Sequence, residues 1–282
     1  MSLPAEIKRC FPPRAADSHK GTYGTLLSVC GSYGMAGAAV LAARSAGRCG
    51  TGLVLAAVPH TIYPIVASQL PEVVFLPLHD ERTSLQALTA ALPKATALLI
   101  GCGLGNTPHT AALVNGLLSV AACPLLLDAD GINAAAAHIS ILETAHAPLV
   151  LTPHPKELAR LMHCTVETVQ QNREALAKTA AERFHAVVVL KGHRTVVAAE
   201  NGDIWINQTG NAGMAVAGSG DVLAGMIAGL LAQGLPPWDA ARCGVCLHGA
   251  AGDRAAARLS QHAMLPMDIT DELGALFLQL EQ

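Results

Sequence analysis

Short, continuously apolar runs alternate with alanine-rich runs along most of this 282-residue chain. Runs of this kind are typical of β-strands whose two faces are both covered. Strands separated by helical segments imply a parallel sheet with right-handed crossovers. The predicted strands are Thr25–Cys30, Leu53–Val58, Val73–Leu76, Ala97–Ile100, Leu125–Asp128, Leu149–Thr152 and Val187–Lys191. The sequence therefore predicts an α/β fold with three α/β/α layers around a central, mostly parallel sheet.

Helical patterns fill the segments between these strands, and the pattern changes after Lys191. Two further runs, Thr195–Ala199 and Asp203–Asn207, flank an Asn-Gly pair and predict a hairpin. The predicted helices are Ala36–Gly47, Ser84–Leu92, Thr107–Val120, Ala134–Ala145, Pro155–Met162, Thr165–Arg183, Asp221–Gln233, Trp238–Leu259 and Asp268–Leu280. Because no linker or low-complexity tract interrupts the chain, we expect one domain over residues 1–282.

The composition excludes several classes of protein. A net charge of −3 without a basic stripe argues against a nucleic-acid partner. No apolar run is long enough for a membrane span, and the N-terminus has no signal-peptide pattern, so we expect a cytoplasmic protein. Its eight cysteines are then reduced. Cys243 and Cys246 form an isolated CxxC pair, which is weak evidence for a metal or redox site, and its role stays open.

A glycine-rich turn near the C-terminus, Gly218-Ser219-Gly220, precedes Asp221 and a long apolar helix pattern. Glycines allow close approach of a ligand, and the free N–H groups of a helix start attract anions. A carboxylate at such a place repels phosphate unless it takes part in a proton transfer. Asp221 is therefore either a general base in phosphoryl transfer or only a helix N-cap.

Loops that follow the predicted strands carry further glycines and charged residues, as expected of a ligand site at the carboxyl edge of a sheet. The sequence contains no GxxxxGK[ST] motif, which disfavours a P-loop NTPase. The segment Gly101–Gly105 reads GxGxG, and Leu223 occupies the last glycine position of a GxGxxG pattern begun at Gly218. A nucleotide must therefore bind on a different scaffold.

Seven segments together resemble the ribokinase-like superfamily and, within it, the ADP- or ATP-dependent NAD(P)H-hydrate dehydratases. They are His19–Gly24, Gly31–Val54, Gly101–Gly105, Leu125–Asn133, Leu151–Met162, Val188–Val197 and Asn211–Gly234. Glycine turns like that at Gly218 occur across many kinases of this superfamily. The GMAGAA segment from Gly34 and the TPHPKE segment from Thr152 point to the dehydratase.

The resemblance implies repair of the S form of hydrated NADH or NADPH (NADHX, NADPHX). ADP or ATP, with Mg²⁺, phosphorylates the C6 hydroxyl of the hydrated ring, and loss of phosphate restores NADH or NADPH. Asp221 would accept the hydroxyl proton. Many relatives carry an N-terminal epimerase domain, and this chain begins about 20 residues before the dehydratase pattern. We therefore expect an NAD(P)HX epimerase as a separate functional partner, and a homotetramer by analogy with the family.

The same resemblance assigns the remaining site residues. The hydrated dinucleotide would lie against Ala38 or Ala39, Gly103 or Gly105, His154 and Asp221. The nucleotide would contact Lys191, Gly192, His193, Arg194, Thr195, Asn211, Gly213, Gly218, Ser219 and Gly220. Glu157 would lie near a Mg²⁺-bound water. Asp128 and Asp130 are either helix caps or part of the catalytic group.

Two other functions remain open on the sequence. A ribokinase-like kinase of a vitamin-precursor alcohol would share the turn at Gly218, but it would release a stable phosphorylated product. A nucleotide-binding sensor would bind ADP without turnover, and it would not need an acid at Asp221.

Overall fold

The computed structural model describes residues 3–281, with residues 81 and 82 described by their backbone only. Nine strands form one sheet in the order β3-β2-β1-β4-β5-β6-β7-β8-β9. Strands β1 to β7 pair in parallel, and β8 and β9 add an antiparallel hairpin at one edge. The strands are β1 (Thr25–Val29), β2 (Leu53–Pro59), β3 (Val74–Leu78), β4 (Ala97–Ile100), β5 (Leu125–Leu127), β6 (Leu149–Leu151), β7 (Ala186–Leu190), β8 (Val196–Ala198) and β9 (Ile204–Ile206).

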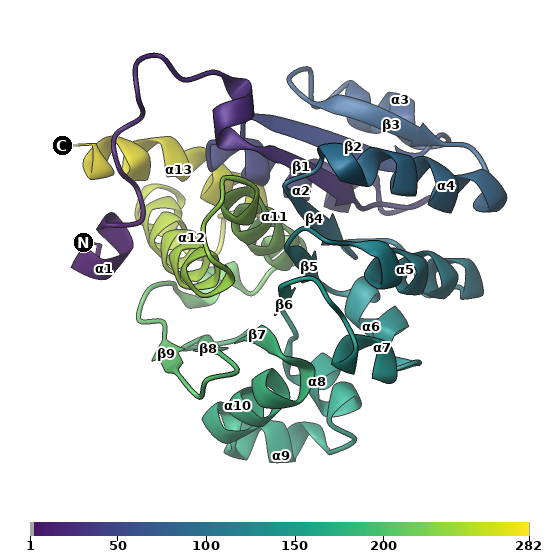
Figure 1. Ribbon diagram of the computed structural model, residues 1–282. Coiled ribbons are helices and arrows are strands. Elements are labelled where there is room, and N and C mark those ends of the chain that lie inside the picture. Colours follow the sequence, from purple (N-terminus) through teal and green to yellow (C-terminus); the bar gives the residue numbers. More distant parts are fainter. Residues whose placement is uncertain (1–2, 282) are drawn as a thin grey trace.

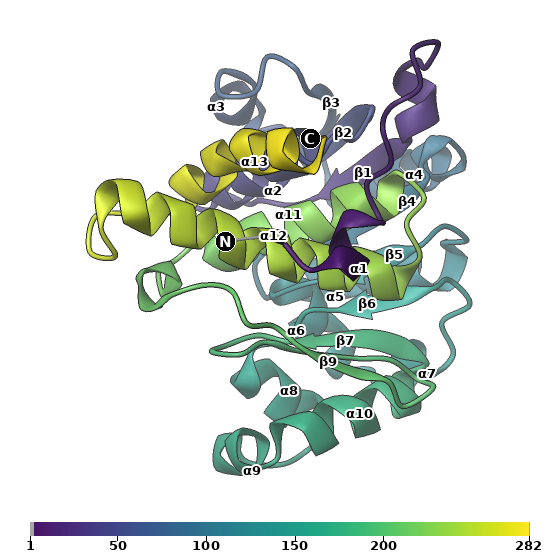
Figure 2. The same ribbon diagram turned by 90° about the vertical axis from the view of Figure 1, so that its left-hand side faces the viewer.

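Helices cover both faces of the sheet (Figures 1 and 2). One layer contains α2 (Ala36–Arg48), α11 (Ser219–Ala232), α12 (Pro237–Leu259) and α13 (Pro266–Leu280), and the opposite layer contains α4 (Glu81–Ala91), α5 (Pro108–Val120), α6 (Asp130–Ala136), α7 (Ser140–Glu143), α8 (Pro155–Leu161), α9 (Val166–Gln171) and α10 (Arg173–Phe184). The short elements are α1 (Ala5–Lys8), α3 (Tyr63–Ala67) and the 3-10 helices η1 (Lys20–Tyr23), η2 (Leu92–Lys94) and η3 (Ala212–Met214). The predicted three-layer α/β/α fold is thus confirmed.

Successive strand residues explain why the predicted strands were continuously apolar. Leu26 packs in the core beneath α2 and α11, whereas Leu27 packs in the core beneath α4 and α5. Because neighbouring side chains on a strand point to opposite faces, a sheet between two helical layers requires apolar residues at every position. Both leucines are fully buried.

Two predicted helices are wrong in their extent. The prediction over Ala134–Ala145 covers two short helices, α6 and α7, and α6 begins earlier, at Asp130. The alanines of this stretch give no apolar period from which a break could be placed. The prediction over Thr165–Arg183 is interrupted at Asn172, where φ is −130° and the side-chain amide donates to the carbonyl oxygen of Thr168 at 3.1 Å. Asparagine side chains compete with the backbone in this way.

The cysteine pair lies on the inner side of α12, where Cys243 and Cys246 are both buried. This placement fits small apolar side chains in a core. None of the helices in residues 3–281 is both long and apolar enough to cross a membrane.

Candidate active site

The candidate site lies where the carboxyl ends of β4, β5, β6 and β7 face the start of α11 (Figure 1). Helix α11 begins without a side-chain cap. Its N-cap residue, Gly218, has φ of +95°, a conformation that favours glycine. Asp221 is the third residue of the helix, so its interpretation as an N-cap is wrong. The uncapped helix start is suited to binding an anion.

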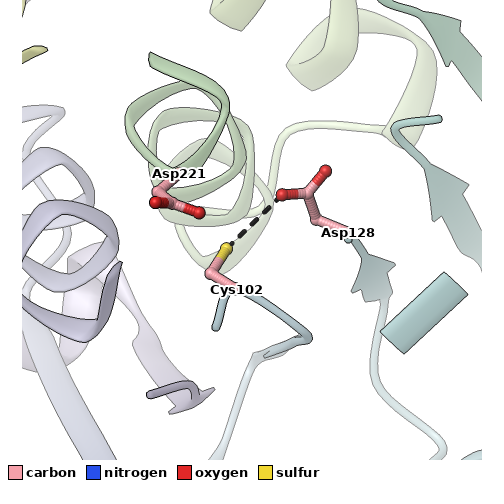
Figure 3. Close-up of side chains that lie close together, drawn as sticks. All are labelled: Cys102, Asp128 and Asp221. Atoms are coloured by element: carbon pink, nitrogen blue, oxygen red, sulfur yellow. Dashed lines mark hydrogen bonds between the residues drawn. The ribbon is translucent and has the colours of Figure 1, made fainter. Parts of the chain in front are cut away.

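Three side chains from separate segments converge beside this helix start. Figure 3 shows Asp221 from the first turn of α11, Asp128 from the end of β5 and Cys102 from the loop after β4. One ligand atom of each lies within 4.8 Å of the other two, and the Cys102 thiol donates to Asp128 Oδ2 at 3.6 Å. Burial, followed by repulsion from Asp128, raises the pKa of Asp221 to about 6.

A buried lysine balances the charge of this cluster. Lys191 Nζ lies 2.6 Å from Asp128 Oδ1 and 4.0 Å from Glu157 Oε2. The hydroxyl of Thr152 donates to the same Asp128 oxygen at 2.7 Å. Burial lowers the pKa of Lys191, but the attraction of Asp128 and Glu157 outweighs it and leaves this pKa above its ordinary value. The sequence left open whether Asp128 is a helix cap or part of the catalytic group. In the structure, Asp128 anchors Lys191.

His154 caps α8, and its hydrogen bonds define its protonation. Its Nδ1 accepts the backbone N–H groups of Lys156 and Glu157, so the ring proton is on Nε2, which lies 3.3 Å from Glu157 Oε1. Burial and the charge of Lys191 lower the pKa of His154. The ring is therefore neutral near pH 7, and it lines the adjoining cleft.

Next to the start of α11 lies a cleft of about 700 Å³. Eight residues that were predicted to contact the nucleotide line this cleft. Five belong to the loop after β7, and three lie at or near the start of α11: Lys191, Gly192, His193, Arg194 and Thr195, and Asn211, Ser219 and Gly220. Leu223, Val245 and Met214 provide apolar wall. Two predicted residues are not part of this wall. Gly218 packs against Leu41, and Gly213 packs against Gln261.

Four residues predicted to bind the dinucleotide lie at the loop after β4 or beside it: Ala38, Ala39, Gly103 and Gly105. His154, predicted for the same site, instead lines the cleft. Gly103 faces Ala38: a Cβ atom placed on Gly103 would lie 2.7 Å from that of Ala38. Ala39 is only 2% exposed, whereas Ala38 is partly exposed and can line a binding surface. The N–H of Gly105 donates to Asp130 Oδ2 at 2.8 Å, so Asp130 supports this loop.

Sequence reasoning missed two residues of the site. Cys102 was treated as one of several scattered cysteines, although it separates Asp128 from Asp221. His248 of α12 lines the cleft, and its Nε2 lies 3.4 Å from Ser219 Oγ. Burial lowers the pKa of His248 to about 4, so its ring is neutral at pH 7. The sequence offered one signal for His248: it is a histidine among glycines and apolar residues of a predicted buried helix.

The carboxylates of Asp128, Asp221 and Glu157 determine which kind of metal ion this site could bind. Carboxylate oxygens are ligands that Mg²⁺ prefers. Asp128 is already bonded to Lys191 and Thr152, and Glu157 Oε2 accepts the N–H of His154 at 2.8 Å. A hydrogen bond with Cys30, burial and the neighbouring carboxylates keep the pKa of Cys102 high, and a protonated thiol is a poor metal ligand. These donors fit Mg²⁺ held through water rather than a closed protein cage.

Comparison with known proteins agrees with this geometry. The family model for NAD(P)H-hydrate dehydratase matches residues 26–274. The ADP-dependent (S)-NAD(P)H-hydrate dehydratase of Neisseria meningitidis is 44% identical over 247 residues, which cover 86% of this chain and 81% of the relative. The chain also matches bifunctional NAD(P)H-hydrate repair enzymes and spans about half their length, 52% for that of Moorella thermoacetica at 46% identity.

Solved structures extend the likeness to the fold. The ADP/ATP-dependent NAD(P)H-hydrate dehydratase of Bacillus subtilis, co-crystallised with ATP/Mg²⁺, has a TM-score of 0.86 at 34% identity, with 97% of this chain and 96% of that chain covered. A ribokinase-like superfamily protein of Enterococcus faecalis has a TM-score of 0.87 at 27% identity, covering 98% and 94% of the two chains. The predicted ribokinase-like fold is confirmed. The chain belongs to the NAD(P)H-hydrate dehydratase family.

Proposed function

We propose that this chain dehydrates the S form of hydrated NADH or NADPH with ADP or ATP as phosphoryl donor. The observation that carries the proposal is the position of Asp221. Its carboxylate lies at an uncapped helix start, between the cleft that contains Lys191 and the loop that contains Gly103. A base at that position can meet a hydroxyl from one side while phosphate is held from the other.

The first step is phosphoryl transfer to the ring hydroxyl. The C6 oxygen attacks the terminal phosphorus of the nucleotide as its proton passes to Asp221, and ADP becomes AMP (or ATP becomes ADP). A base works best when its pKa is near the working pH, and the pKa of Asp221 is about 6. Backbone N–H groups at the start of α11 stabilise charge on the transferred group.

The second step is elimination. Hydroxide is a poor leaving group, whereas phosphate is a good one. The C6–O bond breaks, phosphate leaves with that oxygen, and loss of the C5 proton forms the ring double bond of NADH or NADPH. The nucleotide thus converts the hydroxyl into a group that can depart.

Other residues bind and orient in this scheme. Lys191 and the loop through Thr195 hold the phosphates and ribose of the donor, and Asn211, Ser219 and Gly220 border it. Ala38 and Gly103 line the dinucleotide site, with Gly105 supporting its loop and Ala39 packed beneath it, and His154 borders it from the cleft. Glu157 would hold Mg²⁺ through water, and a bound Mg²⁺ ion would neutralise part of the phosphate charge.

A chromatographic assay tests the proposal. Hydrated NADH is incubated with the chain and ADP, ATP or no nucleotide, and NADH, phosphate and the nucleotide product are quantified. We expect NADH only with nucleotide, with one phosphate and one dephosphorylated nucleotide formed per NADH. NADH formation without nucleotide, or none under any condition, would contradict the proposal. A stable phosphorylated product from a vitamin-precursor alcohol would favour the kinase instead, and ADP binding without any product would favour the sensor.

A pair of glycine substitutions tests the dinucleotide side. Gly103 and Gly105 both have positive φ, +65° and +79°, so alanine costs similar backbone strain at either position. Only at Gly103 would the new Cβ crowd Ala38, at 2.7 Å, whereas the nearest neighbours of one at Gly105 lie at 3.8 Å. We expect Gly103→Ala to raise the KM for hydrated dinucleotide by roughly tenfold or more relative to Gly105→Ala. Equal values for the two variants would place the dinucleotide elsewhere.

We also propose the wider context that the family suggests. Residues 1–282 act as one dehydratase domain, and an NAD(P)HX epimerase supplies the S form from the R form. The exposed side chains Tyr63, Ile65 and Val74, at the edge of the sheet formed by β3, are consistent with self-association, and a homotetramer is the assembly we propose. Light scattering coupled to size-exclusion chromatography measures it directly.

A further inference from the structure

One face of α12 supports the loop that forms the far wall of the nucleotide cleft. Gly249, Gly252 and Asp253 share this face, because residues three and four apart on a helix are neighbours. They contact the segment of residues 207–214, which follows β9 and includes η3. Six members of that segment line the cleft: Asn207, Thr209, Gly210, Asn211, Ala212 and Met214.

Asp253 holds this segment by two hydrogen bonds. Its Oδ2 accepts the backbone N–H of Gly210 at 2.9 Å, and its Oδ1 accepts the side-chain amide of Asn211 at 3.0 Å. The Asn211 oxygen in turn accepts the N–H of Gly213 at 2.9 Å. Hydrogen bonds to a charged group are stronger than neutral ones. Asp253 therefore fixes both the path of the loop and the rotamer of Asn211.

The two glycines let the loop lie directly on the helix. A Cβ atom on Gly249 would lie 2.2 Å from Thr209 Oγ1 and 2.7 Å from the Thr209 carbonyl oxygen. A Cβ atom on Gly252 would lie 2.4 Å from the sulfur of Met214. Thr209 Oγ1 also donates to the carbonyl oxygen of Cys246 at 3.0 Å. Any side chain at either glycine would push the loop toward the cleft.

We propose that Gly249, Gly252 and Asp253 form a positioning platform that sets the shape of the nucleotide site by fixing the loop that lies on them. The inference rests on the proposed function, since it assigns the cleft to ADP or ATP. Gly252 and Asp253 are not among the residues that line the cleft, whereas Gly249 borders it beside Thr209. Asp253 acts only through Gly210 and Asn211. Loss of the platform should weaken nucleotide binding while the chemistry at Asp221 continues.

The test compares Asp253→Ala and Gly249→Ala with the wild-type chain. We expect the KM for ADP to rise roughly tenfold in each variant, because a loop that is displaced or no longer anchored fits the nucleotide less well. The kcat and the KM for hydrated NADH should change less than about twofold. Asp253→Glu should fall between wild type and Asp253→Ala. Arg258→Gln is the control, because it removes an exposed ion pair of the same helix with Glu272 and leaves the loop intact.

A double-mutant cycle separates positioning from general destabilisation. In the Asn211→Ala background, Asp253→Ala should have a smaller effect on the KM for ADP than in the wild-type chain. The hydrogen bond between these two side chains is already lost in that background, so the second substitution cannot remove it again. Additive effects, or equal rises of both KM values, would overturn the inference. If Asp253→Ala does not fold, Asp253→Asn and Gly249→Ala give the same comparison by isothermal titration with ADP. A wild-type chain that neither binds ADP nor forms NADH would instead contradict the proposed function.

Discussion

Asp221→Asn should abolish turnover while leaving ADP binding intact. Loss of a general base costs about 10²- to 10⁴-fold in rate, and asparagine cannot accept the hydroxyl proton. ADP should bind at least as tightly, because a negative charge beside the phosphate site is removed. Single-turnover assays and titration calorimetry measure the two effects separately. Asp203→Asn, in the exposed turn of the β8–β9 hairpin, is the control and should behave as wild type. Retained turnover would remove Asp221 as the base.

The same substitution should stabilise the fold. In the native state the pKa of Asp221 is raised from 3.8 to about 6, so the folded chain holds this proton more tightly than the unfolded chain. The free energy of unfolding therefore falls as pH rises between these two values, and the loss is complete above pH 6. A shift of this size corresponds to about 3 kcal/mol at most, and part of it should return in Asp221→Asn at pH 8. Chemical denaturation at pH 4 should show a much smaller gain.

The pH profile of the wild-type enzyme follows from the same group. The carboxylate form is the active base, so kcat/KM should fall on the acid side with an apparent pKa near 6. The pKa of His248 is lowered to about 4 and that of His154 is lowered by burial and by the charge of Lys191, so neither should produce a limb above pH 7. An acid limb near 4 would show that the pKa of the base is not raised in the free enzyme.

The strands could be predicted from the sequence because each is buried on both faces. Leu98, Leu99 and Ile100, for example, are all fully buried, which leaves no polar position to blur the run. The break between α6 and α7 could not be predicted, because alanine at successive positions is compatible with a helix of any length. The break at Asn172 accompanies a local hydrogen bond from its side chain to the carbonyl oxygen of Thr168, and an asparagine inside a helical pattern does not by itself show that this bond forms.

The site residues also fall into two groups, those that could be predicted from the sequence and those that could not. Gly218 and Asp221 lie three residues apart in sequence, so their chemistry could be inferred from a single segment. The contact of Cys102 with Asp128 joins residues 26 positions apart, and it depends on the pairing of β4 with β5. The contact of Ser219 with His248 depends on how α12 packs against α11. A residue that is common in cores gives no signal of function until such packing is known.

Lys191→Met should destabilise the chain more than any other single change at the site. Asp128 and Glu157 are 1% and 3% exposed, and Lys191 is the cation that lies between them. Removing one partner of a buried ion pair costs about 3–5 kcal/mol, because the remaining charge stays buried and unpaired. We expect a loss of that order in the free energy of unfolding at pH 7, together with loss of turnover. Lys178→Met, which removes an exposed lysine paired with Glu182, should be neutral.

A second substitution distinguishes charge balance from catalysis. Asp128→Asn in the Lys191→Met background removes one uncompensated carboxylate, so it should recover a large part of the lost stability. It also removes the repulsion that raises the pKa of Asp221, but it cannot restore the contact of Lys191 with phosphate, so turnover should stay low. Denaturation curves and the NADH assay on the same preparations give both values. If stability and activity recovered together, Lys191 would act only as a structural counter-ion, and the phosphate would be held by the loop and the start of α11 alone.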